Sequence, residues 1–180
     1  MKTVTTPIDG LIVFEPSVFV DDRGYFFESW NKSFFKSCGL DLNFDQDNQS
    51  SSKKNVLRGL HFQNPPYGQG KLVRVVNGSV LDVVVDLRRK SNTYGKNFTI
   101  KLSSLNKKIF WIPPGFAHGF LTLEDDTIFC YKCTGSYNKN AESTLLWNDP
   151  TLDIDWGINN PILSTKDLQG VSFKDFSTQF

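Results

Sequence analysis

The chain contains only two histidines, and each lies among residues that could do acid–base chemistry. His61 lies in Arg58-Gly59-Leu60-His61-Phe62-Gln63 and is followed by Lys71, while His118 lies in Pro114-Gly115-Phe116-Ala117-His118-Gly119-Phe120. An imidazole can accept a proton near neutral pH, and Arg58 and Lys71 carry fixed positive charge. This set of groups suits removal of a carbon-bound proton beside a carbonyl, because the cations can stabilise the oxyanion that forms.

Metal chemistry fits these residues poorly. A barrel that binds a metal ion normally supplies two closely spaced histidines, a carboxylate and a further histidine, because the ion needs three or four ligands. The sequence has no His-x-His, and its two histidines lie far apart. It also lacks the dinucleotide and phosphate-loop motifs, so we expect neither a metal nor another cofactor.

Two other candidates each have a structural interpretation as well. Tyr131 lies in the middle of a run that reads as a strand, where a tyrosine usually packs, although its phenol could act as an acid. Asp167 follows Ser164 in the pattern Ser-x-x-Asp, so its carboxylate could serve only to cap a helix. Neither residue would be chosen from its chemistry alone.

The elements that must position these residues read mostly as strands. Hydrophobic residues alternate with a period of two, and turns interrupt them at intervals of around ten residues, which is typical of a jelly-roll sandwich or barrel. We therefore expect an all-β fold with short peripheral helices. The predicted strands lie at Leu11–Phe14, Tyr25–Trp30, Phe98–Leu102, Ile109–Ile112, Phe120–Leu123, Thr127–Cys133 and Thr144–Trp147.

The clearest predicted element is a hairpin. Strands at 71–76 and 79–87 are separated by Asn77-Gly78, the preferred pair for a type I′ turn. A short helix is expected between the N-cap Asn31 and the stop at Gly39, and another after Ser164.

The predicted strands leave the two histidines in different settings. Simple alternation places Arg58 and His61 on opposite faces of one strand, so their convergence requires a bend near Gly59. His118 is expected in a loop between strands, flanked by Gly115 and Gly119.

Cys130 and Cys133 have a spacing that also occurs in redox and zinc sites. On a strand, residues three apart face opposite sides, and their Cα atoms lie roughly 10 Å apart, whereas a disulfide tolerates at most about 7 Å. We therefore expect reduced thiols that pack in the fold.

The bulk composition excludes several classes of function. The 180 residues predict a single domain over 1–180, and a net charge of +1, from 20 basic and 19 acidic residues, gives no reason to expect a nucleic-acid partner. No apolar run reaches the roughly 20 residues of a membrane span, and the N-terminus lacks the apolar core of a signal peptide. We expect a cytoplasmic protein with no membrane partner.

The motifs, in their order along nearly the whole chain, resemble those of the dTDP-4-dehydrorhamnose 3,5-epimerases, the cofactor-independent enzymes of the dTDP-L-rhamnose pathway. The matching segments are Asp22-Arg23-Gly24 with Phe27-Glu28, Gln46-Asp47-Asn48, the run from Lys54 to Gln63, Gly70-Lys71-Leu72-Val73-Arg74, the run from Trp111 to Phe120, Tyr131-Lys132, Leu146-Trp147-Asn148-Asp149 and Leu163-Ser164 with Lys166-Asp167. The departures are mild. Asn64-Pro65-Pro66-Tyr67-Gly68 lies where relatives vary, and Ser136 stands where relatives often have a second aromatic residue.

The resemblance implies a cupin-like jelly roll that forms a homodimer and binds a dTDP-linked 4-keto-6-deoxysugar. It implies epimerisation of dTDP-4-dehydro-6-deoxy-D-glucose at C3 and C5 to dTDP-4-dehydro-L-rhamnose through an enolate. His61 would be the proton acceptor, Asp167 its partner, Tyr131 the proton donor and Tyr137 the residue that stacks on thymine. The resemblance also assigns substrate binding to Arg23, Glu28, Gln46, Asn48, Arg58, Lys71, His118, Glu142 and Lys166.

Three alternatives remain open from the sequence. An epimerase that acts only at C3 or only at C5 on a related nucleotide sugar would share almost all of these residues. A metal-dependent cupin would need more histidines than the chain has. A carbohydrate-binding jelly roll without activity would not need His61, Lys71 and Tyr131 together.

Overall fold

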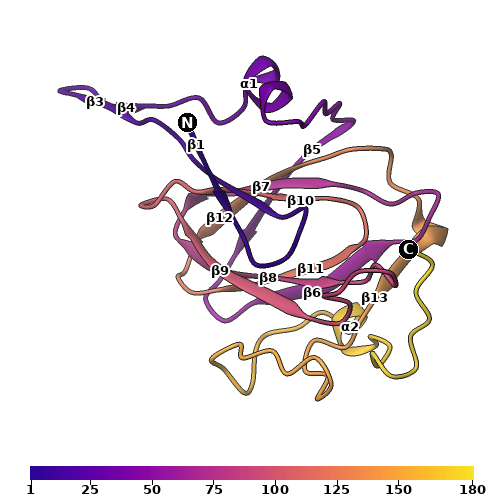
Figure 1. Ribbon diagram of the computed structural model, residues 1–180. Helices are drawn as coiled ribbons and strands as arrows, with labels where there is room; N and C mark the ends of the chain where they lie inside the picture. Colours follow the sequence, from indigo (N-terminus) through magenta and orange to yellow (C-terminus); the bar gives the residue numbers. More distant parts are fainter.

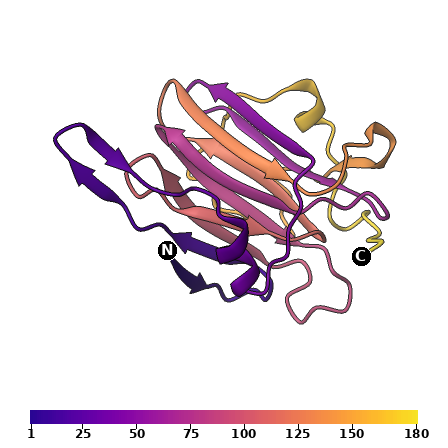
Figure 2. The same ribbon diagram turned by 90° about the horizontal axis from the view of Figure 1, so that it is seen from above.

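The computed structural model describes all 180 residues, and most of the chain folds into two facing antiparallel β-sheets (Figure 1, Figure 2). The six-stranded sheet contains, in spatial order, β1 (Lys2–Thr5), β2 (Ile12–Glu15), β10 (Ile109–Ile112), β7 (Lys71–Asn77), β12 (Thr127–Cys133) and β5 (Gln46–Ser52). The five-stranded sheet contains β13 (Glu142–Thr144), β6 (Leu57–Gln63), β11 (Phe116–Thr122), β8 (Ser79–Asp86) and β9 (Asn97–Ser103).

The remaining elements lie outside the two sheets. Strands β3 (Phe19–Asp21) and β4 (Gly24–Phe26) pair only with each other and form an arm that projects from the body in both views (Figure 1, Figure 2). The helices are α1 (Lys32–Ser37), the 3₁₀-helix η1 (Lys139–Ala141) and α2 (Thr165–Leu168). None of them is long and apolar enough to cross a membrane.

Apolar side chains from both sheets fill the space between them. Val73 and Phe129 of the six-stranded sheet pack in one buried cluster with Val84 and Phe120 of the five-stranded sheet. Because side chains alternate along a strand, every second residue contributes to this core. The rings of Phe120 and Phe129 stack across the two sheets with their centroids 4.1 Å apart.

Each sheet is also covered on its outer face. Phe35 of α1 packs against Phe14 and Trp111 over the six-stranded sheet. The C-terminal segment covers the five-stranded sheet, where Trp156 is buried in the same cluster as Leu57. The layers therefore run from the α1 segment through the two sheets to the C-terminal segment.

The prediction of an all-β jelly roll with short peripheral helices is confirmed. Strands β10 and β12 have the predicted bounds. Helix α1 begins after its predicted cap, since the side chain of Asn31 accepts a hydrogen bond from Phe34 N–H at 3.0 Å. These elements were predictable because their signals are local.

The predicted hairpin at Asn77-Gly78 is wrong. Strand β7 pairs with β10 and β12, whereas β8 pairs with β11 and β9, so the chain passes from one sheet to the other at this turn. Only Gly78 has a positive φ, at 76°, although a type I′ turn requires positive φ at both central residues. Three other predictions also fail: His118 lies inside β11 rather than in a loop, and the predicted strand at 25–30 ends at Phe26. The predicted strand at 144–147 is also wrong, because β13 ends at Thr144.

Strand β6 contains the bend that brings Arg58 and His61 to one side. His61 pairs with His118 and Arg58 pairs with Phe120, so β6 carries one more residue than β11 over this interval and forms a β-bulge. Gly59, within the bulge, has a φ of 140°, and its peptide bond to Leu60 is cis. A Cβ at position 59 would lie 2.4 Å from the Cα of Gly119.

We expect Gly59→Ala to lower the free energy of unfolding by about 2 kcal/mol or more, because alanine is disfavoured at this φ and its Cβ would overlap the backbone of β11. Gly157→Ala is the matched control. Gly157 also has a positive φ, of 68°, but a Cβ there would meet nothing within 4 Å, so only the backbone cost of about 1 kcal/mol applies. Urea unfolding at one fixed protein concentration measures both, and equal losses would show that the close approach of β6 and β11 is unimportant.

Candidate active site

A cavity between the two sheets contains most of the residues predicted to do chemistry. It has two lobes that share His61, Lys71 and Tyr131 in their walls. The Tyr137 lobe, of about 210 Å³, is lined among others by Gln46, Asn48, Tyr137 and Glu142. The Arg58 lobe, of about 300 Å³, is lined among others by Arg58, His118, Phe120, Phe129, Lys166 and Asp167.

His61 and Asp167 form a close pair in the wall of this cavity. The Nε2 atom of His61 lies 2.6 Å from Asp167 Oδ1. Because a carboxylate accepts a hydrogen bond, Nε2 carries the proton and the lone pair lies on Nδ1, which has no hydrogen-bond partner in the chain. An imidazole held in this tautomer can accept a proton at Nδ1.

Asp167 is held in place by the N-terminus of α2. Its Oδ2 atom accepts hydrogen bonds from the backbone N–H and the hydroxyl of Ser164, whose Oγ accepts one from Asp167 N–H. Burial raises the pKa of Asp167, but the hydrogen bonds from His61 and Ser164 outweigh this effect and leave the pKa below its ordinary value. The capping role and the role beside His61 are compatible, because each uses a different carboxylate oxygen.

Tyr131 and Lys71 line the same cavity from the other sheet. Burial raises the pKa of the Tyr131 phenol, which therefore stays protonated at neutral pH. Burial lowers the pKa of Lys71, and its Nζ makes one hydrogen bond, of 3.4 Å, to the carbonyl oxygen of His61. An acid and a cation thus lie on one wall of the cavity and a base on the other.

A second pair of carboxylate and imidazole is buried between the sheets. His118 Nε2 lies 2.9 and 3.1 Å from the two carboxylate oxygens of Asp82. Burial raises the pKa of Asp82 and lowers that of His118. No third His, Cys, Asp or Glu joins either pair in an arrangement that could hold a metal ion. Sequence reasoning missed Asp82 as a site residue, although a carboxylate between Leu81 and Val83 in an apolar strand was a visible signal.

The rim of the cavity carries two cations and an exposed aromatic ring. Glu142 forms an ion pair with Lys166 at 2.5 Å and accepts a hydrogen bond from the hydroxyl of Tyr137 at 2.9 Å. Arg58 Nε donates to Ser52 Oγ at 3.2 Å, which leaves the terminal guanidinium nitrogens free. Guanidinium and ammonium groups beside an aromatic face are suited to a phosphorylated ligand with an aromatic base.

Two of the predicted site residues lie outside this cavity. Arg23 is at the tip of the β3–β4 arm, where it pairs only with Asp21. Glu28 follows the arm and accepts a hydrogen bond from Asn31 at 3.0 Å. Every other predicted site residue lines one of the two lobes.

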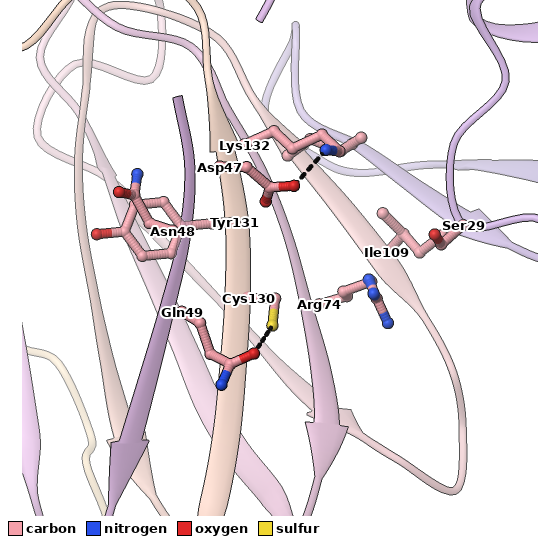
Figure 3. Close-up of a pocket in the computed structure, with 10 residues that line it drawn as sticks. Ser29, Asp47, Asn48, Gln49, Arg74, Ile109, Cys130, Tyr131 and Lys132 are labelled. Atoms are coloured by element: carbon pink, nitrogen blue, oxygen red, sulfur yellow. Dashed lines mark hydrogen bonds and ion pairs between the residues drawn. The ribbon is translucent and has the colours of Figure 1, made fainter. Parts of the chain in front are cut away.

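The outer face of the same strands presents a different set of side chains. Figure 3 shows Tyr131 on one side of β12, and Cys130 and Arg74 on the other. Cys133 faces the cavity side and is buried, and neither Cys130 nor Cys133 forms a disulfide. The two thiols face opposite sides of the strand, as their spacing predicts.

Comparison with known proteins identifies the family. The family model for dTDP-4-dehydrorhamnose 3,5-epimerase matches residues 5–175. Proteins of that name from Pseudomonas aeruginosa and Shigella flexneri are 50% and 49% identical over 177 and 176 residues, with 97% of each chain covered. A crystal structure of a dTDP-6-deoxy-D-glucose 3,5-epimerase from Legionella pneumophila, in complex with dTDP-4-keto-L-rhamnose, has a TM-score of 0.93 and 42% identity, and the match covers 98% of this chain and 94% of that one. Because the likeness spans nearly the whole length at this identity, the chain belongs to the dTDP-4-dehydrorhamnose 3,5-epimerase family.

Proposed function

We propose that this chain is a cytoplasmic enzyme that epimerises dTDP-4-dehydro-6-deoxy-D-glucose at C3 and C5 to give dTDP-4-dehydro-L-rhamnose. The observation that carries the proposal is a single cavity with an imidazole base, His61, in one sheet and a protonated phenol, Tyr131, in the other. The names of the relatives favour inversion at both carbons over an enzyme that acts at one. No metal or other cofactor takes part in the proposed reaction.

The reaction begins at His61. In a 4-keto sugar, C3 and C5 both flank the carbonyl, so each carries an acidified C–H bond. Nδ1 of His61 takes that proton, and the imidazolium that forms is stabilised by the ionised carboxylate of Asp167 at Nε2. The electron pair of the C–H bond moves into the ring, and negative charge collects on O4.

Lys71 stabilises the charge on O4. Its ammonium has no carboxylate partner, so it is available to the oxyanion. One such donor is commonly worth about 3 kcal/mol in the transition state.

Tyr131 returns a proton to the carbon from the opposite face. Because Tyr131 and His61 belong to different sheets, a ring bound between them meets the base on one side and the acid on the other. Protonation from the acid's side inverts the carbon. Once His61 has released its proton to solvent and Tyr131 has regained one from solvent, a second round at the other carbon gives the doubly inverted product.

The rim residues bind the nucleotide. The diphosphate meets Arg58 and Lys166, and thymine stacks on Tyr137, whose hydroxyl is held by Glu142. Gln46 and Asn48 contribute amide groups to the Tyr137 lobe, and His118 contacts the sugar. The proposal involves no nucleic-acid or membrane partner.

A second copy of the chain completes the site as a homodimer. The arm exposes Phe19, Val20, Tyr25 and Phe26, with exposed fractions of 57 to 77%. An isolated two-stranded hairpin is marginally stable in water, and exposed apolar patches mark interfaces, so the arm requires a partner surface. Packing on a second copy in a symmetric dimer would carry Arg23 and Glu28 from the arm toward the partner's cavity.

We expect His61→Asn to abolish exchange of solvent deuterium into C3 and C5, because it removes the proposed general base. Loss of a general base costs about 10²–10⁴-fold in rate. NMR of the sugar in D₂O measures the exchange, and binding of dTDP checks that the site remains formed. Near-normal exchange in the variant would rule out His61 as the base.

Tyr131→Phe should separate exchange from inversion, because it removes the acid and leaves His61 in place. Deuterium should still enter at the carbon that His61 deprotonates, while formation of epimer falls. Tyr94→Phe is the matched control, since Tyr94 packs on Phe173 outside the cavity. Equal loss of exchange and inversion would mean that the hydroxyl only positions the substrate, and no loss of either would assign Tyr131 to packing.

Subunit complementation tests the dimer and the role of Arg23 together. Arg23→Ala and His61→Asn should each be weakly active alone, whereas a mixture allowed to exchange subunits should recover about a quarter of wild-type activity. The recovery arises because half of the dimers are mixed and each mixed dimer has one intact site. Activity no higher than the mean of the two parents would show that Arg23 does not act across subunits.

A further inference from the structure

The pair formed by Asp82 and His118 has no assigned role in the proton transfers. We propose that Asp82 is a positioning residue that holds His118 with its proton on Nε2, so that Nδ1 accepts a hydrogen bond from a hydroxyl group of the sugar. This inference rests on the proposed function and extends it, because it specifies how His118 recognises the sugar.

The contact between the two residues is built into the centre of a sheet. Strands β8 and β11 are neighbours, and Asp82 pairs with Phe120, two residues from His118 on the same strand. The imidazole lies between the carboxylate and the ring of Phe129, to which it is stacked with centroids 6.1 Å apart. Nε2 is within hydrogen-bond distance of both oxygens of Asp82, so the ring has one fixed orientation. Nδ1 has no partner in the chain, and His118 lines the Arg58 lobe.

The charges around the pair indicate a neutral imidazole. Asp82 is fully buried and Lys71 is half-buried, and their opposite charges interact and balance. A proton on His118 Nδ1 would add a third, uncompensated charge in the same buried space, which is strongly disfavoured. Burial and the nearby Lys71 accordingly lower the pKa of His118. A neutral ring that donates from Nε2 has a lone pair on Nδ1 and can only accept there.

His61 and His118 therefore differ in role, although the Nε2 atom of each is hydrogen-bonded to a carboxylate. They pair directly across β6 and β11, and each has a carboxylate at Nε2. The side chain of His61 is 28% exposed, whereas that of His118 is 7% exposed and that of Asp82 is fully buried. Water and the cavity can stabilise an imidazolium at His61. At His118 the same charge would be enclosed, which favours hydrogen bonding over proton removal.

A double-mutant cycle tests whether Asp82 acts through His118. Asp82→Asn should lower kcat/KM for the sugar nucleotide by roughly 10-fold or more, because an amide can turn its NH₂ toward Nε2 and reverse the tautomer. His118→Gln keeps an amide N–H for Asp82 and replaces the Nδ1 lone pair of the ring with a carbonyl oxygen in a different position. In the His118→Gln background, Asp82→Asn should change kcat/KM by less than about 2-fold. Independent, multiplicative losses would overturn the proposal and point to an action of Asp82 through Lys71.

Asp86→Asn is the matched control for the loss of a buried carboxylate. Asp86 lies on the same strand and face as Asp82, is equally buried, and pairs with Arg88 outside the cavity. It should lower the melting temperature while leaving kcat/KM unchanged. Binding of dTDP should be the same in wild type and Asp82→Asn, because Asp82 acts on the sugar end of the ligand. Weaker binding of dTDP in Asp82→Asn would contradict the proposal.

NMR of wild-type protein labelled with ¹⁵N-histidine tests the tautomer without any substitution at the pair. The chain has only two histidines, so His61→Asn assigns both sets of signals. The proposal predicts a proton on Nε2 and an unprotonated Nδ1 for His118 at neutral pH. A proton on His118 Nδ1 would overturn it. Failure of the wild-type enzyme to turn over the 4-keto sugar would refute the proposed function instead, and the NMR result would still decide the state of the pair.

Discussion

The hydrogen bond between His61 and Asp167 joins two parts of the chain that are 106 residues apart, and much of the fold serves to form it. His61 depends on the bulge in β6, where Gly59 approaches Gly119. Asp167 depends on α2, a helix of four residues that is too short to be stable alone. It is held by the Ser164 cap and by the packing of the C-terminal segment on the five-stranded sheet. The C-terminal segment therefore supplies a residue of the candidate site as well as a cover for the sheet.

Local signals in the sequence predicted local structure well. The cap at Asn31, the capping box at Ser164 and the strand at 127–133 each depend on residues within a few positions of one another. The pairing of strands did not follow from such signals. Alternation assigns a face to each side chain but names no partner strand, so Asn77-Gly78 looked like a hairpin although it connects two sheets. Only the packing of the whole chain decides between these outcomes.

In the candidate site, too, residue types were predictable from the sequence, whereas contacts between distant strands were not. His61 and Lys71 were predictable from residue type, and the roles of Tyr131 and Asp167 came from the family resemblance. The sequence indicated that a bend near Gly59 was needed, but it could not show where in a sheet the bend lies. The bulge is defined only by the register between β6 and β11. Asp82 was missed because its partner, His118, was assigned to a loop, where it could not be placed beside β8. Arg23 and Glu28 do not line the cavity of their own chain, because Arg23 lies at the tip of the projecting arm (Figure 1) and Glu28 follows that arm.

The balance of charge in the cavity indicates how the proposed reaction stabilises the enolate. Asp167 forms a hydrogen bond with His61 and Asp82 with His118, while Glu142 forms an ion pair with Lys166. The negative charge of Asp82 also acts on Lys71. Arg58 at the rim and Lys71 in the wall make no ion pair. In the proposed complex, a diphosphate pairs with Arg58 equally in the ground state and the transition state. This interaction strengthens binding without raising the rate of the chemical step. In the proposed reaction, negative charge on O4 develops beside Lys71 only once a proton has left carbon, and the low exposure of Lys71 makes that interaction strong. In the proposed reaction Lys71 therefore stabilises the transition state more than the bound substrate, and an interaction of that kind raises the rate of the chemical step.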